Sequence, residues 1–260
     1  MVGLVRVAAA TTAEWPDLID ELDRWGEAGR VAVLWWRDDD AVAATPQLDE
    51  LLLFAAEVPV AIAVIPAHVR PELADAVPST GRVAVLQHGW QHANRAEDGK
   101  KSEYPEGRPE AVVGAEIGAG QARLKGLFGP RALPVFVPPW NRIACEIVPQ
   151  LVEHGIAGLS AIASPRTATL PAGLVAIDVH VDVVAWRGHR GFIGTAAALG
   201  RLIGHLRVAR SLAAASARPI GILTHHLIMD RATVVFLDRL IAVTHAHRAV
   251  RWATVAEFLP

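Results

Sequence analysis

The chain has 260 residues, of which 52% are hydrophobic, and its formal net charge is −2 at pH 7. These values fit a single α/β domain over residues 1–260 and give no reason to expect a nucleic-acid partner. No apolar run approaches the roughly 18 residues of a membrane span, and no apolar stretch typical of a signal peptide is found near residue 1. The only cysteine, Cys145, excludes an intrachain disulfide and fits a reducing compartment. We therefore expect a cytoplasmic protein.

Continuous apolar runs recur along the chain and predict strands that are covered on both faces, as in a parallel sheet. Helical patterns lie between these runs, and the alternation favours a distorted (β/α) barrel over an open sheet. Seven or so parallel strands are expected, in a barrel that is complete or incomplete. The predicted strands are 31–36, 58–65, 82–87, 133–137, 158–162, 174–181 and 220–224; the predicted helices are 45–56, 110–128, 147–154, 196–215 and 231–245, after a first helix that begins near Thr12.

Three adjacent carboxylates, Asp38, Asp39 and Asp40, follow the first predicted strand. Adjacent carboxylates repel one another, and the apolar strand beside them adds a desolvation cost. A bound cation would relieve both penalties. A solvated acidic loop is the alternative, and the neighbouring apolar run favours the cation site.

Two imidazoles follow the third predicted strand, at His88 and His92. The spacing of four residues alone is a weak signal, but here it places both rings on one side of the turn that follows a strand. One Asp and two His are a complete protein ligand set for a catalytic divalent ion with an open position for water. Active sites of α/β barrels lie at the carboxyl ends of the strands. The pattern therefore predicts a metal-dependent hydrolase.

Three further strand ends carry polar or aromatic side chains. A Pro-Pro turn leads to Trp140 and Arg142, and the segment after residue 181 contains Asp182 and Trp186. The last long apolar strand ends in Leu223, Thr224, His225 and His226, and strand alternation allows only one of these two imidazoles to face the barrel interior. Each segment taken alone is equally compatible with ordinary core packing. The polar stretch 94–109 is expected to be either a lid over the site or a solvated insertion.

The order of these motifs resembles the polysaccharide deacetylase family, carbohydrate esterase family 4, over roughly residues 31–226. That family carries five short motifs on a distorted (β/α) barrel: an Asp-Asp pair, a His-x-x-x-His, a Pro-rich turn with an aromatic residue, an Asp…Trp segment and a Leu-x-His. The counterparts here are, in order, Asp39-Asp40, His88 with His92, Pro138-Pro139-Trp140, Asp182 with Trp186, and Leu223 with His225.

The resemblance implies a role for each of these residues. It makes Asp39 the general base and His225 the general acid, and it assigns one divalent ion, zinc first with cobalt or nickel as alternatives, to Asp40, His88 and His92. It implies that Leu223 and Trp186 line a small pocket for the acyl methyl group. A carbohydrate or small-molecule substrate would lose an N-acetyl or related N-acyl group. Substrate contacts are expected from Arg37, Trp140, Arg142, Asp182, Trp186 and Leu223.

Two features leave the assignment of the acid and the base open. The three consecutive Asp allow the pair to be Asp39-Asp40 or Asp38-Asp39, and we prefer the first because Ala41 then replaces the family's Gly. His226 stands where the family has an acidic residue, so the choice of His225 rests on alternation and alignment.

A third departure bears on activity itself. Val137 occupies the place of an Arg that supports the base in the family, so Arg37 or Arg142 would have to substitute for it. A catalytically silent carbohydrate-binding protein that keeps the metal site is therefore an alternative to the enzyme. A hydrolase that opens a cyclic amide is a third possibility.

Overall fold

The computed structural model describes residues 12–163, 169–214 and 218–260. Within them, nine strands form one sheet in the order β6-β5-β4-β3-β2-β1-β8-β7, β9 also pairs with β1, and all the strand pairs are parallel. The strands are β1 (Ala32–Ala41), β2 (Val60–Val64), β3 (Val83–His88), β4 (Ala132–Val137), β5 (Gly158–Leu159), β6 (Val175–Ala176), β7 (Val179–Asp182), β8 (Ile220–Thr224) and β9 (Val250–Trp252).

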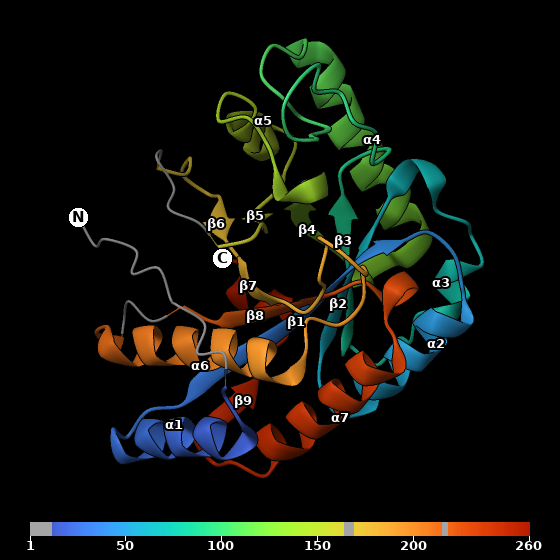
Figure 1. Ribbon diagram of the computed structural model, residues 1–260. Helices are drawn as coiled ribbons and strands as arrows, with labels where there is room; N and C mark the ends of the chain where they lie inside the picture. The colour runs from blue at the N-terminus through green and yellow to red at the C-terminus, as the bar shows by residue number, and fades with distance from the viewer. Residues whose placement is uncertain (1–11, 164–168, 215–217) are drawn as a thin grey trace.

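The sheet curls until its two ends meet (Figure 1). β6 and β7 stand at opposite ends of the strand order, yet only residues 177 and 178 separate them in the chain. A bridge between Ile162 and Val179 also joins the continuation of β5 to β7. Residues 175–182 therefore pair with β5 at one end and with β8 at the other. The result is the distorted (β/α) barrel predicted from the sequence, and the strand predicted at 174–181 is these two short strands.

Seven α-helices in the described residues surround the barrel, and α1, α6 and α7 lie together along one side of it (Figure 1). Two of them begin at local capping residues: Thr45 accepts the N–H of Leu48 in α2, and Asp230 accepts the N–H of Thr233 in α7. None of the described helices is long and apolar enough to cross a membrane. The helices are α1 (Trp15–Glu27), α2 (Pro46–Leu53), α3 (Leu73–Ala76), α4 (Glu110–Phe128), α5 (Val148–Glu153), α6 (Thr195–Ser211) and α7 (Arg231–His245).

Strand alternation sorts the apolar side chains into two main layers. Trp35, Leu86 and Leu223 belong to the cluster that fills the barrel interior, whereas Trp36 and Ile222 belong to the larger cluster packed against the helices. Because both faces of each strand are buried, the sequence shows continuous apolar runs instead of alternation. The polar side chains at the carboxyl ends of the strands lie next to this interior cluster.

Candidate active site

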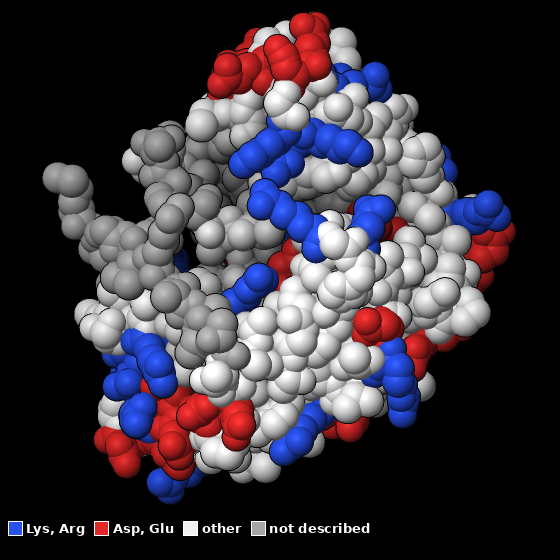
Figure 2. Space-filling model, in the orientation of Figure 1, with Lys and Arg blue, Asp and Glu red and all other residues white. Residues whose placement is uncertain are grey.

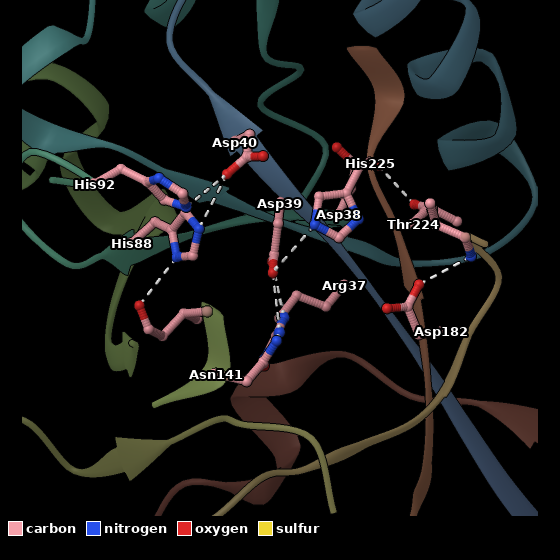
Figure 3. Close-up of polar contacts among 12 residues, drawn as sticks. Arg37, Asp38, Asp39, Asp40, His88, His92, Asn141, Asp182, Thr224 and His225 are labelled. Atoms are coloured by element: carbon pink, nitrogen blue, oxygen red, sulfur yellow. Dashed lines mark hydrogen bonds and ion pairs between the residues drawn. The ribbon is translucent and has the colours of Figure 1, made fainter. Parts of the chain in front are cut away.

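The carboxyl end of β1 brings Asp39 and Asp40 to the same opening (Figure 3). Neighbouring side chains of a regular strand point to opposite faces. The pairing of β1 with β2 shifts register between Asp38 and Ala41, and Asp40 has a φ of 74°. This break in the strand turns Asp40 toward the side that Asp39 faces. Asp38 points the other way and pairs with His226.

Asp40, His88 and His92 converge at this opening, with their candidate ligand atoms within 4.8 Å of one another. The Oδ1 atom of Asp40 lies 3.1 Å from Nε2 of His88 and 3.4 Å from Nε2 of His92. Nδ1 of His88 lies 3.0 Å from the carbonyl oxygen of Val137, so it donates its proton there and keeps the Nε2 lone pair for a ligand. In the described part of the chain, no other three His, Cys, Asp or Glu side chains converge in this way. This donor set fits a divalent cation.

The charges at these three residues also suit a cation. Burial opposes ionisation of Asp40, but its hydrogen bond with His88 and the neighbouring imidazoles outweigh burial and hold its pKa well below the usual value. Burial and the nearby His88 lower the pKa of His92, which keeps that ring neutral. Burial acts in the same direction on His88, yet Asp39 and Asp40 raise its pKa overall. A cation at His88 therefore competes with a proton.

A buried glutamate holds the turn that carries His92. The carboxylate of Glu103, only 1% exposed, accepts the backbone N–H groups of Trp90, Gln91 and His92 at 3.1, 2.7 and 3.2 Å. The turn begins at Gly89 with a φ of 56°, where a Cβ atom would lie 2.1 Å from Oε2 of Glu103. His92 itself has a φ of 55°. The turn therefore depends on a glycine and on one carboxylate, and it holds a candidate metal ligand, His92, in a backbone conformation that non-glycine residues rarely adopt.

The polar stretch 94–109 has an exposed part and a buried part. Residues 97–101 are exposed, whereas Ser102, Glu103 and Tyr104 are buried. The base of the exposed part is closed by Asn94, whose Oδ1 accepts the N–H of Ser102 at 3.0 Å. Sequence reasoning missed Glu103, because an acidic residue in a polar stretch looks like a solvated one. The adjacent Tyr104 was the only signal that the chain returns to the core there.

Arg37 lies beneath Asp39 and binds both oxygens of its carboxylate (Figure 3). The distances are 2.8 Å from Nε to Oδ1 and 3.0 Å from Nη2 to Oδ2. The guanidinium also donates to the backbone oxygen and Oγ of Ser160 and to Oδ1 of Asn141, at 3.0, 2.7 and 2.7 Å. Arg37 has no exposed surface, so it is placed to hold Asp39 and not to contact a substrate as we expected. Arg142 instead donates to the carbonyl oxygen of Lys101 at 2.9 Å.

The two histidines at the end of β8 point to opposite sides. Nε2 of His225 lies 4.0 Å from Oδ2 of Asp39, whereas Nδ1 of His226 lies 2.5 Å from Oδ1 of Asp38. Asp38 also accepts the hydroxyl proton of Thr224 at 2.6 Å. Alternation along β8 thus places His225 beside the candidate base and His226 in a buried network outside the opening.

Two tryptophans border the opening. The ring of Trp140, whose φ is 55°, lies 4.3 Å from that of His92, and the ring of Trp186 meets that of His225 edge-on at 4.7 Å. Nε1 of Trp186 donates to Asp182 at 2.7 Å. Leu223 is fully buried in the barrel interior, so in this conformation it offers no open surface to an acyl group.

No protein-family model matches the sequence, and no curated protein matches it. Three of the similar solved structures are a provisionally assigned polysaccharide deacetylase from Mycobacterium smegmatis, an esterase of carbohydrate esterase family 4 from Streptococcus mutans, and a family 4 acetyl xylan esterase from Clostridium thermocellum in complex with a cobalt ion. They are 17%, 15% and 15% identical to this chain, with TM-scores of 0.65, 0.57 and 0.51. The matches cover 96%, 95% and 86% of this chain and 93%, 93% and 89% of the others. The chain therefore has the fold of the polysaccharide deacetylases and esterases of carbohydrate esterase family 4, as the order of its motifs implied.

Proposed function

We propose that the protein is a metal-dependent amide hydrolase that removes an N-acetyl or related N-acyl group. The observation that carries the proposal is the convergence of two sets of side chains. Asp40, His88 and His92 form a ligand set, and Asp39 and His225 stand next to it as a candidate base and acid. A binding site for a cation requires only the first set. The fold shared with known deacetylases and esterases supports the same reaction class.

Each side chain has a separate role in the proposed hydrolysis. When bound, a divalent cation supplies Lewis acidity, because it polarises the acyl carbonyl and lowers the pKa of water. Asp39 accepts the proton of the attacking water, and its ion pair with Arg37 fixes the direction of its carboxylate. His225 donates a proton to the departing amine, without which the C–N bond does not break. Nitrogen and carboxylate ligands suit zinc, with cobalt or nickel as alternatives.

The two tryptophans favour a small-molecule or carbohydrate substrate. Trp140 and Trp186 stand beside a metal ligand and the acid respectively, and Trp186 is 42% exposed. Exposed aromatic rings next to polar groups are typical of sites that hold a ligand with both apolar faces and hydroxyl groups. We expect both rings to orient the substrate, together with Arg142 at the rim. Asp182 contributes by holding the ring of Trp186 in place.

Metal binding and turnover test the proposal separately. Calorimetry on metal-stripped protein should show one zinc, cobalt or nickel ion per chain, and Asp40→Ala or His88→Ala should abolish binding. Asp39→Asn should keep the ion and lower turnover of N-acetylated sugars by roughly 10²- to 10⁴-fold. Asp98→Asn, the same change on the exposed part of the stretch 94–109, is the control and should be neutral. Unchanged turnover in Asp39→Asn would contradict the assignment of the base.

The two alternative functions predict different results in the same assay. Val137 in place of the supporting Arg favours a silent carbohydrate-binding protein, whereas the ion pair of Arg37 with Asp39 supports the enzyme. A silent carbohydrate-binding protein would bind metal and sugars without releasing product from any N-acyl compound. A cyclic-amide hydrolase would use the same base and ion, so the substrate panel should include one cyclic amide.

A further inference from the structure

A separate recess of about 620 Å³ lies beside the candidate active site, lined by Ile162 and by residues from β7, α6 and the segment between them. We call it the arginine recess, after Arg187 and Arg201 in its wall. Asp182 is the only carboxylate among its lining residues. Both oxygens of that carboxylate are already occupied, by the backbone N–H of Val184 at 2.9 Å and by Nε1 of Trp186 at 2.7 Å. The recess therefore has an excess of positive charge.

The two arginines lack the partners that others in this protein have. Arg37 and Arg108 are each paired with a carboxylate. Among the described residues, neither Arg187 nor Arg201 forms an ion pair, and Arg201 donates one N–H to the backbone oxygen of Asp182 at 2.8 Å. Guanidinium groups with free N–H donors bind planar and tetrahedral oxyanions in preference to neutral ligands.

Two of the three histidines in the lining, His180 and His205, add hydrogen-bonding groups without adding negative charge. His180 and His205 line the recess, with their rings edge-on at 4.9 Å. Nδ1 of His180 accepts the backbone N–H of Gly221 at 3.1 Å, so the neutral ring carries its proton on Nε2. Burial together with His205 lowers the pKa of His180 to about 3, and burial together with Arg201 lowers the pKa of His205. Both rings therefore stay neutral at pH 7 and leave the excess positive charge of the recess unchanged.

We propose that the arginine recess binds an oxyanion group of the substrate, a phosphate or a carboxylate. Trp186 connects the recess to the active site, because its ring contacts His225 while its Nε1 binds Asp182 in the recess wall. If the departing amine of a substrate lies next to His225, the part of the substrate that carries this amine lies beside the recess. Lys and Arg side chains border the hollow near the centre of the face in Figure 2, although no lysine is among the described residues that line the arginine recess. Only this assignment to the substrate rests on the proposed function; the anion site itself does not.

Binding can be measured without metal or turnover. Calorimetry should compare glucose 6-phosphate and glucuronate with glucose, so that the first two separate phosphate from carboxylate and the third serves as the neutral reference. At least one acidic sugar should bind, and Arg187→Gln and Arg201→Gln should each weaken that binding roughly 10- to 100-fold. Arg201→Lys, which keeps the charge, should retain part of it. Arg207→Gln removes the same charge from the exposed side of α6, at a residue that does not line the recess, and should change nothing.

Clear results would overturn the proposal. These are equal affinity for glucose and the acidic sugars, no saturable binding at about 10 mM ligand, or unchanged affinity in both glutamine variants. Turnover provides a second readout: N-acetylglucosamine 6-phosphate or another acidic N-acyl sugar should have the lower KM, and Arg187→Gln should raise only that KM. If acidic sugars bind through the arginines but no N-acyl compound is cleaved, the hydrolase fails and the anion site stands.

Discussion

Replacing Arg37 by methionine should strongly destabilise the protein, because it leaves the carboxylate of Asp39 buried without its partner. The two side chains are 0% and 2% exposed and form two contacts of 2.8 and 3.0 Å. Removing one member of a buried ion pair costs about 3–5 kcal/mol. For a chain of this size, each 1 kcal/mol lowers Tm by about 2–4 °C, so Tm should fall by roughly 6–20 °C.

A double-mutant cycle isolates this ion pair from the other contacts of Arg37. The cycle compares Arg37→Met, Asp39→Asn and the double variant by denaturant unfolding. With the carboxylate neutralised, the double variant should be less destabilised than the sum of the two single variants by roughly 1–3 kcal/mol. Arg142→Met is the matched control and should cost less than about 1 kcal/mol, because that side chain contacts only a backbone oxygen near the surface. Additive single effects, or equal costs for Arg37→Met and Arg142→Met, would refute the reasoning.

Three further predictions concern the turn of His92 and the half-buried His180. Glu103→Gln keeps the shape but removes the charge that three backbone N–H groups bind, so the Kd for zinc should rise about 10-fold or more in a competitive chelator titration; an unchanged Kd would contradict it. Gly89→Ala should lower the free energy of unfolding by about 1–3 kcal/mol, because φ is 56° and the new Cβ meets Glu103; a cost near zero would argue against the described turn. The pKa of His180 is about 3 in the folded protein against 6.5 normally, so the unfolded state binds an extra proton between these values and stability falls as pH drops from 6.5 toward 3. His180→Gln should flatten that fall in urea unfolding measured across this range, and an equally steep fall would show that His180 is not its cause.

The regular elements were the most predictable part of the fold. The helices at 110–128 and 231–245 have the predicted bounds, because a Gly-Pro pair follows the first and a capping Asp precedes the second. β9 and α3 were not predicted, since three or four residues are too few to show a period. The break between β6 and β7 was missed because valine and other apolar residues recur on both sides of it, and only the closure of the barrel separates the two strands.

The arrangement of the site could be predicted only in part. The motif order indicates which strand ends carry polar side chains, and the structure brings Asp40, His88 and His92 together. The choice between the two aspartate frames depends on a register shift and on a positive φ at Asp40, and neither has a signature in residue types. The sequence left two candidates for the partner of Asp39, Arg37 and Arg142, and the fold decides for Arg37, two residues earlier in β1.

The anchoring of the turn by Glu103 has a consequence for how such a chain diverges. Asn94 and Ser102 tie the base of the exposed segment together, and Glu103 then fixes the backbone of the histidine turn independently of that segment. Insertions, deletions and composition changes within residues 97–101 therefore need not disturb the imidazole of His92. Evolution can reshape this rim while the candidate metal site beneath it is inherited unaltered.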